Sequence, residues 1–114
     1  MVFMVSRRQL MNDEKFIKSF QQAGGWFILC SLEALIEYDK LEIPRKQVLL
    51  NKISKKYGRE LSTIDYRIKH TRRIIRANRS KDALIKIRDS AVINRMHPEA
   101  NKLAKKLLAK IDEL

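Results

Sequence analysis

The stretch QVLLNKISKKYGRELSTIDYRIKHTRRIIRAN, residues 47–78, decides the fold that the sequence predicts. Its first part, Gln47–Tyr57, carries apolar residues at helical spacing and stops before Gly58, a residue that closes many helices in the left-handed conformation. A second helix is predicted from Ser62 to about Asn78. Two amphipathic helices joined by a short turn that contains glycine have the spacing of a helix-turn-helix.

The second predicted helix is amphipathic. Ser62 is expected to cap its N-terminus, with Asp65 at the capping-box position. Apolar or small residues at spacings of three and four form its predicted inner stripe, namely Leu61, Ile64, Ile68, Thr71 and Ile75. Because an α-helix has about 3.6 residues per turn, Tyr66, Lys69 and Arg73 then project from the opposite side.

The outward side of this helix offers hydrogen-bond donors and positive charge. Groups of this kind read base edges in the major groove and neutralise phosphates. Asp65 lies at the edge of this side and is expected to accept from a cytosine amino group. The residues predicted to contact DNA are Arg59, Ser62, Thr63, Asp65, Tyr66, Lys69, His70, Arg73 and Arg76. A solvated basic helix face is the alternative interpretation of the same pattern.

The rest of the chain completes a predicted all-α, compact bundle of five to six helices. The most apolar segment, from Trp26 to about Leu41, is expected to be a central buried helix. Pro44 suits the first turn of the next helix, and Pro98 is expected to open the last one. The helix predicted over 81–95 has the inner side Ala83, Leu84, Ile87, Ala91 and Val92.

The chain of 114 residues is long enough for one domain with a single core. Residues 1–23 are predicted to be an N-terminal helical extension, with a helix from about Arg8 to Gln22. Residues 24–114 are predicted to form the helix-turn-helix DNA-binding domain.

The charge balance predicts an anionic partner. Lys and Arg number 25 against 13 Asp and Glu, which gives a net charge of +12. Nucleic acid, an acidic membrane surface and an acidic protein all suit such an excess. The excess is uneven, because residues 58–114 carry fifteen basic and seven acidic side chains whereas residues 1–57 carry ten and six.

Several other kinds of protein are disfavoured. A lone cysteine, Cys30, allows no disulfide within the chain and suits a reducing cytoplasm. With His70 and His97 it does not supply a tetrahedral zinc set, and no catalytic set or Gly-rich phosphate loop is found. We therefore expect no enzymatic activity, cofactor, metal or small-molecule substrate. Since no apolar run has the roughly 18 residues of a membrane span, we expect a cytoplasmic, nucleoid-associated protein.

Four segments follow one another in an order found in a known family. Residues 25–29, GWFIL, are similar to a Gly-aromatic helix opening, and residues 53–57, ISKKY, to an Ile-Ala-Lys-Lys-Phe helix ending. Residues 97–99, HPE, stand at a Lys-Pro-Thr position. The family's Ser, Val, Glu, Ile, Arg and His of the recognition helix fall on Ser62, Ile64, Asp65, Ile68, Lys69 and His70. Residues 24–111 thus resemble the C-terminal DNA-binding (effector) domain of the sporulation response regulators, the stage-zero sporulation protein A family.

The resemblance implies an all-helical domain in which Asp65 and Lys69 meet bases or phosphates, and a homodimer or a tandem array on DNA. Tyr66 stands where the family has a base-facing Arg, so the family's DNA box is not expected here. The recognition helix is also more basic than the family's after His70, with Arg72, Arg73 and Arg76. The family's receiver domain and phosphorylation switch are not expected, and a sporulation role does not follow.

Two functions remain as hypotheses. The first is a sequence-specific double-stranded DNA-binding protein, a transcriptional regulator without its own receiver domain. The second is a basic helical protein-interaction module that docks on an acidic protein, through the helix after Pro98 or the segment Met1–Phe20. RNA binding is less favoured, because no aromatic β-platform for stacking bases is predicted.

Overall fold

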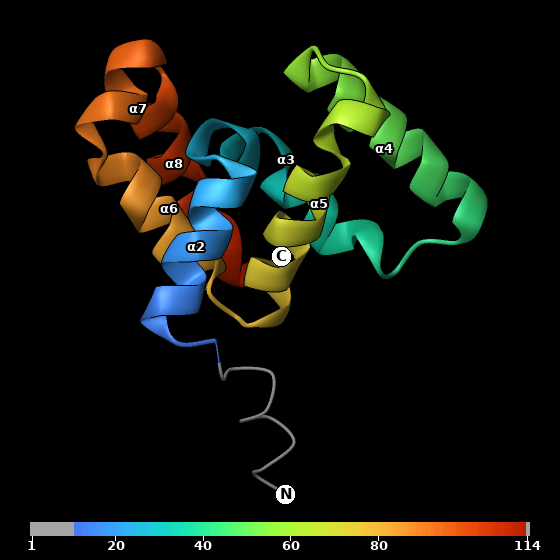
Figure 1. Ribbon diagram of the computed structural model, residues 1–114, viewed down its shortest axis with the longest axis horizontal. Coiled ribbons are helices and arrows are strands. Elements are labelled where there is room, and N and C mark those ends of the chain that lie inside the picture. The colour runs from blue at the N-terminus through green and yellow to red at the C-terminus, as the bar shows by residue number, and fades with distance from the viewer. Residues whose placement is uncertain (1–10, 114) are drawn as a thin grey trace, which may run out of the picture.

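The computed structural model describes residues 11–113, and this part of the chain is all-α, as predicted (Figure 1). Its helices are α2 (Asp13–Ala23), α3 (Gly25–Tyr38), α4 (Ile43–Tyr57), α5 (Leu61–Arg76), α6 (Ser80–Asp89), α7 (Ala91–Met96), α8 (Ala100–Lys110) and the short 3-10 helix η1 (Ile111–Glu113). Residues 11–113 thus contain seven α-helices, more than the five to six expected. The expected helix start at Arg8 lies outside the described residues.

α3 is the central helix, and its predicted burial is confirmed. Its largest inner side chains, Phe27, Ile28, Leu32 and Leu35, are almost completely buried. α2, α4, α5, α6 and α8 all pack against it. The ribbon shows α4 and α8 flanking it (Figure 1). α3 ends at Tyr38, earlier than expected, because the chain turns there.

The side chains of α3 join two hydrophobic clusters. Phe27 and Leu35 pack with Ile53 of α4 and with Ile64 and Ile68 of α5. The larger cluster draws on α2, α3, α5, α6 and α8, and consists of Phe16, Phe20, Ala23, Ile28, Leu29, Leu32, Ile74, Ala83, Leu84, Ile87, Ala100, Ala104 and Leu107. α3 therefore holds α4 and α5 through one cluster and most of the remaining helices through the other.

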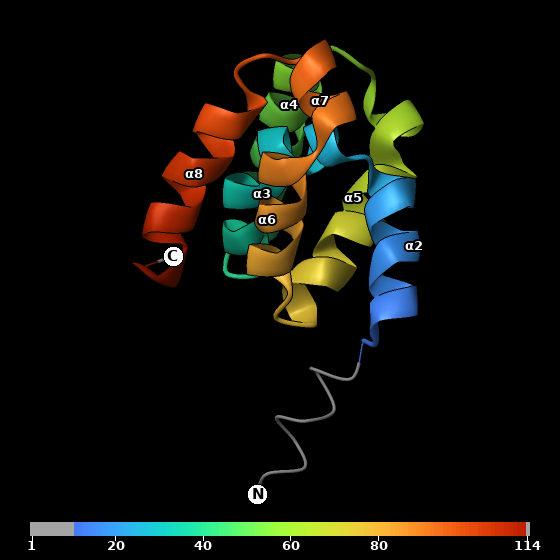
Figure 2. The same cartoon turned by 90° about the vertical axis from the view of Figure 1, so that its left-hand side faces the viewer.

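α2 runs antiparallel beside α5 (Figure 2). At one end of the pair, Arg67 Nη1 donates to the carbonyl oxygen of Ala23 at 2.7 Å. At the other end, Arg79 pairs with Asp13 at 2.9 Å and donates to the carbonyl oxygen of Met11 at 3.2 Å. α2 therefore shares the core of the helices that follow it, while the domain boundary at residue 23 stays a prediction.

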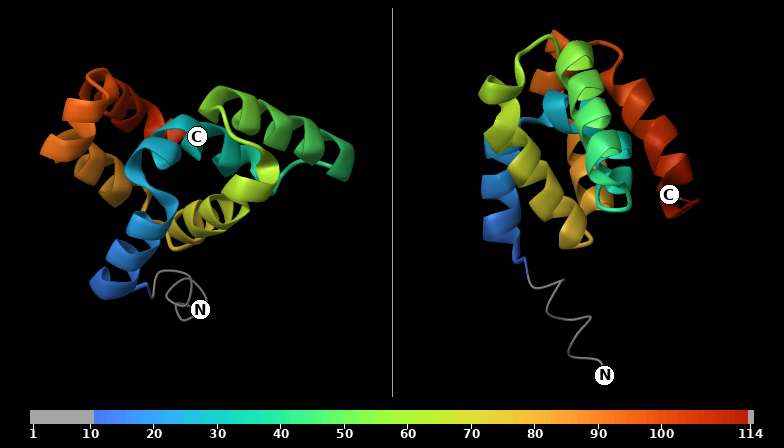
Figure 3. Two further views of the ribbon diagram at one scale, coloured as in Figure 1. Left: turned by 45° about the horizontal axis from the view of Figure 1, so that its top comes forward. Right: turned by 90° about the vertical axis from the view of Figure 1, so that its right-hand side faces the viewer.

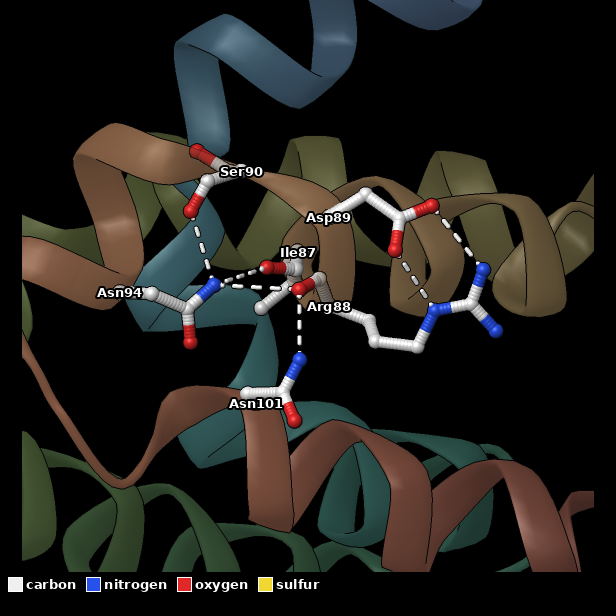
Figure 4. Close-up of polar contacts among 6 residues, drawn as sticks. All are labelled: Ile87, Arg88, Asp89, Ser90, Asn94 and Asn101. Carbon is white, nitrogen blue, oxygen red and sulfur yellow. Dashed lines mark hydrogen bonds and ion pairs between the residues drawn. The ribbon is translucent and has the colours of Figure 1, made fainter.

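The prediction of a single helix over 81–95 is wrong, because the helix is interrupted at Ser90. The Ser90 side chain caps α7. Asn94 Nδ2 donates to the carbonyl oxygens of Ile87 and Arg88 at 3.1 Å and of Ser90 at 2.8 Å, which satisfies the end of α6 (Figure 4). Because of this interruption, two residues of the predicted inner side are exposed to solvent, namely Ala91 and Val92.

The predicted capping box of α5 is also wrong. α5 begins at Leu61 and Glu60 holds the N-cap position, so Ser62 already lies inside the first turn. No side chain caps the helix there. Instead, Thr63 Oγ1 donates to the carbonyl oxygen of Glu60 at 2.7 Å, and Asp65 is exposed.

Other helix ends are set by single residues. α5 stops at Arg76, two residues earlier than predicted, because Asn78 has a left-handed φ of 59° that no α-helix continues. α8 begins at Ala100, and Pro98 lies in the turn before it rather than in its first turn. Pro44 lies in the first turn of α4, as predicted.

We expect Asn94→Ala to lower the free energy of unfolding by about 0.5–1.5 kcal/mol, because it removes a donor that three carbonyl groups share while each of them keeps another donor. Urea denaturation followed by circular dichroism measures the change. Asn51→Ala is the control, since Asn51 is exposed and accepts from Gln47 within α4; its effect should stay within about 0.5 kcal/mol. Equal stability of the two variants would contradict the role given to Asn94.

Candidate nucleic-acid interface

Two sides of α5 are covered by other helices. The predicted inner stripe is confirmed at Ile64 and Ile68, which are 1% and 8% exposed, and at the fully buried Thr71. Ile75 is half-buried and packs against both hydrophobic clusters. Ile74, which the predicted stripe omits, is fully buried because it joins the cluster that α2 completes. α2 therefore covers a side of α5 that the sequence pattern leaves open.

The third side of α5 is open to solvent, and we call it the open side. Its exposed side chains are Ser62, Asp65, Tyr66, Lys69, Arg73 and Arg76. Thr63 and, in the preceding turn, Arg59 are also exposed. Three of the six are cations and one is a carboxylate, so this side is positively charged.

His70 is the exception among the residues predicted to contact DNA. Its ring is half-buried, and Nδ1 lies 3.3 Å from Ser19 Oγ of α2. Burial lowers the pKa of His70 below its ordinary value, and the charges of Arg73 and Lys69 lower it further. The ring is therefore neutral at neutral pH and faces α2 rather than the open side.

Arg72 ties α5 to the end of α3. Its guanidinium pairs with the carboxylate of Asp39 and lies 4.5 Å from the centroid of the Tyr38 ring. Arg76 Nη2 lies 3.6 Å from the same carboxylate, and Lys46 Nζ of α4 lies 5.0 Å from the same ring. Burial alone would raise the pKa of Asp39, but the Arg72 hydrogen bond and the charges of both arginines outweigh it and lower that pKa. An ionised carboxylate thus sits among the cations.

A groove of about 500 Å³ follows part of the open side, between α5, α4 and the end of α3. It is lined by Tyr38, Leu50, Leu61, Asp65, Ile68, Lys69, Arg72, Arg73 and Arg76. Four residues predicted to contact DNA meet in this lining, namely Asp65, Lys69, Arg73 and Arg76. Outside the lining lie Arg59, Ser62, Thr63, Tyr66 and His70. The sequence pattern missed Tyr38, because no local spacing connects the end of α3 with α5.

The turn between α4 and α5 is closed by hydrogen bonds. Gly58 has a left-handed φ of 80°, as predicted for the residue after the helix. The N–H groups of Gly58 and Arg59 donate to the carbonyl oxygen of Ser54 at 2.8 and 3.2 Å, and Ser54 Oγ donates to the carbonyl oxygen of Arg59. These bonds fix the start of the turn on the last residues of α4. That this pair is a DNA-binding helix-turn-helix stays a prediction.

Comparison with known proteins found no matching family model, no matching curated protein and no matching solved structure. The resemblance to the sporulation effector domains therefore rests on the segments quoted above alone. Within residues 11–113, no helix has the length and apolar character needed to cross a membrane. The same part of the chain holds no cluster of three or more His, Cys, Asp or Glu residues arranged for a metal ion.

His70→Gln is expected to flatten the loss of stability on acidification. Because burial lowers the pKa of His70 in the folded chain, the unfolded chain binds that proton more tightly. Stability is therefore lost as the pH falls below the ordinary value of 6.5, and the substitution removes this contribution.

Urea unfolding at about pH 7.5 and about pH 5 measures the difference between wild type and His70→Gln. The lowered pKa of Asp39 acts in a separate window, below its ordinary value of 3.8. The same pH dependence in both proteins would show that the ring is not desolvated by α2.

Proposed function

We propose that this protein binds double-stranded DNA in a sequence-specific manner through the open side of α5, and that it acts as a transcriptional regulator. One observation carries the proposal: Ile64 and Ile68 hold α5 on the core while Lys69, Arg73 and Arg76 project into solvent. A recognition helix needs this division, because one side must anchor it and the other must meet bases and phosphates. The net charge of +12 supports an anionic partner.

The dimensions of α5 suit the major groove. The helix has 16 residues and so is about 24 Å long, and the groove of B-DNA is about 12 Å wide and admits an α-helix. Ser62, Asp65 and Tyr66 in the N-terminal half, together with Lys69 near the middle of the helix, offer donors and acceptors to base edges. Arg73 and Arg76 in the C-terminal half offer guanidinium groups to phosphates. Contacts with phosphates contribute to the affinity for DNA but not to the preference for a base sequence.

α2 restricts how α5 approaches DNA. The two helices are linked by Arg67 to the Ala23 carbonyl and by the contact between His70 and Ser19. The side of α5 that carries Arg67 and His70 is therefore unavailable to a duplex. We leave His70 out of the proposed contacts and keep Tyr66, which is 45% exposed.

Lys69→Ala is expected to weaken binding to a duplex selected in vitro from a random pool by about tenfold, because a base contact is worth about 1–3 kcal/mol. Binding to unselected duplex should change little. Arg76→Ala should weaken binding to both duplexes by a similar factor and reduce the slope of log K against log salt by about 1, because it removes a phosphate contact. Fluorescence anisotropy over a series of salt concentrations measures these effects.

Lys102→Ala is the matched control, because it removes one exposed positive charge from α8, away from the open side. It should bind both duplexes like the wild type. Wild-type affinity of both Lys69→Ala and Arg76→Ala would remove α5 from the interface. An affinity for DNA that does not change with salt concentration would argue against any contact with DNA phosphates.

A further inference from the structure

A second groove lies over α3 between α4 and α8, which appear as the green and red helices in Figure 3. Its volume is about 570 Å³, and it shares no lining residue with the groove on the open side of α5. Its lining consists of Trp26, Leu29, Cys30, Glu33, Ala34, Glu37, Leu49, Lys52, Ile53, Lys56, Leu103, Lys106, Leu107 and Lys110. We call it the α4–α8 groove.

The lining is one stripe from each of three helices. On α3 the stripe runs from Trp26 to Glu37 at helical spacing, a length of about 16 Å or three turns. α4 and α8 each add a stripe of the same period. The floor is mostly apolar, with Leu29 and Leu107 buried beneath and Leu103 39% exposed at one wall. Glu33 and Glu37 of α3 add two exposed carboxylates to the lining. Three helices that present such stripes to a common axis form three sides of a four-helix bundle, so the shape suits one further helix.

Positive charge runs along both rims of this groove. Lys52 and Lys56 stand one turn apart on α4, and Lys106 and Lys110 stand one turn apart on α8. Lys110 Nζ pairs with Glu33 Oε2 at 2.7 Å, while the other three lysines are exposed. The four lysines outnumber the two carboxylates of α3, so the groove is positively charged. Such a groove, apolar between two basic rims, is complementary to an apolar ridge between two acidic flanks.

We propose that the α4–α8 groove docks an amphipathic helix with acidic flanks, contributed by a partner protein. A second copy of this chain is a poor occupant, because each copy carries a net charge of +12 and the copies repel one another. A fatty acid carries one charge at one end, whereas the lysines here stand on both rims, two on each. The proposal goes beyond DNA binding and does not depend on it.

The chain carries its own reporters for this site. Trp26 is its only tryptophan and Cys30 its only cysteine, and both line the groove. The probe is a synthetic helical peptide of about 14 residues with leucine along one side and glutamate on both flanks. One control peptide has the same composition in scrambled order, and another has lysine in place of every glutamate. Binding is followed by Trp26 fluorescence and by protection of Cys30 from a maleimide, at mildly alkaline pH because burial raises the pKa of that thiol.

The acidic peptide should bind, and the scrambled and lysine peptides should not. The double variant Lys52→Glu, Lys106→Glu should bind the acidic peptide about tenfold more weakly and gain affinity for the lysine peptide, since it reverses one charge on each rim. The matched control Lys55→Glu, Lys102→Glu reverses exposed charges on the same two helices outside the groove and should bind within about twofold of wild type. All four positions are exposed, so both variants should melt like the wild type.

Several outcomes would overturn the proposal. They include equal binding of the acidic and scrambled peptides, binding without protection of Cys30, and equal losses in the two double variants. If protection of Cys30 rises with protein concentration in the absence of any peptide, the groove binds a second copy of the chain instead. Protection by oleate at lower concentration than by the peptide would assign it to a lipid. None of these measurements uses DNA, so the result stands whether or not the chain binds a duplex.

Discussion

Burial of α3 requires cover from several directions at once, because the buried side chains of Phe27 and Leu29 point to nearly opposite sides of the helix. Each such side chain contributes roughly 1.5–3 kcal/mol when it leaves water, so an uncovered side of α3 would cost several kcal/mol. Five helices supply the cover and take their positions from it. The basic side of α5 faces outward because its other side is needed on α3. At the α4–α8 groove this cover of α3 is incomplete.

α2 sets the limits of the proposed interface. It lies along α5 and takes up the polar groups on that side, with Arg67 bound to a carbonyl oxygen and His70 beside Ser19. What remains of α5 is a narrow strip between α2 and the end of α3. A strip of this kind can meet another molecule in fewer orientations than an isolated amphipathic helix, so the fold itself restricts the geometry of the proposed interface.

The sequence pattern predicted those features that depend on local spacing. The burial of Ile64 and Ile68 follows from the helical period, and the left-handed Gly58 follows from turn chemistry. The break at Ser90 was missed, because Asn94 decides it by reaching back to three carbonyl groups. The orientation of His70 depends on Ser19, which is 51 residues away. Contacts across such separations, like the meeting of α3, α4 and α8 at one groove, leave no periodic signal.

Asp39 lies beside two arginines of α5 and restricts the side chain of Arg72 in the absence of a ligand. Its carboxylate binds Arg72 directly and so confines that guanidinium group, while Arg76 Nη2 lies 3.6 Å away and the Arg76 side chain stays 57% exposed. Confined side chains lose less rotational freedom when they bind, which favours ligands whose oxygens match their positions. The same carboxylate repels incoming anions and weakens the attraction for those that fit poorly. In the proposed interface, this acidic residue would therefore favour ligands that fit its shape over polyanions in general.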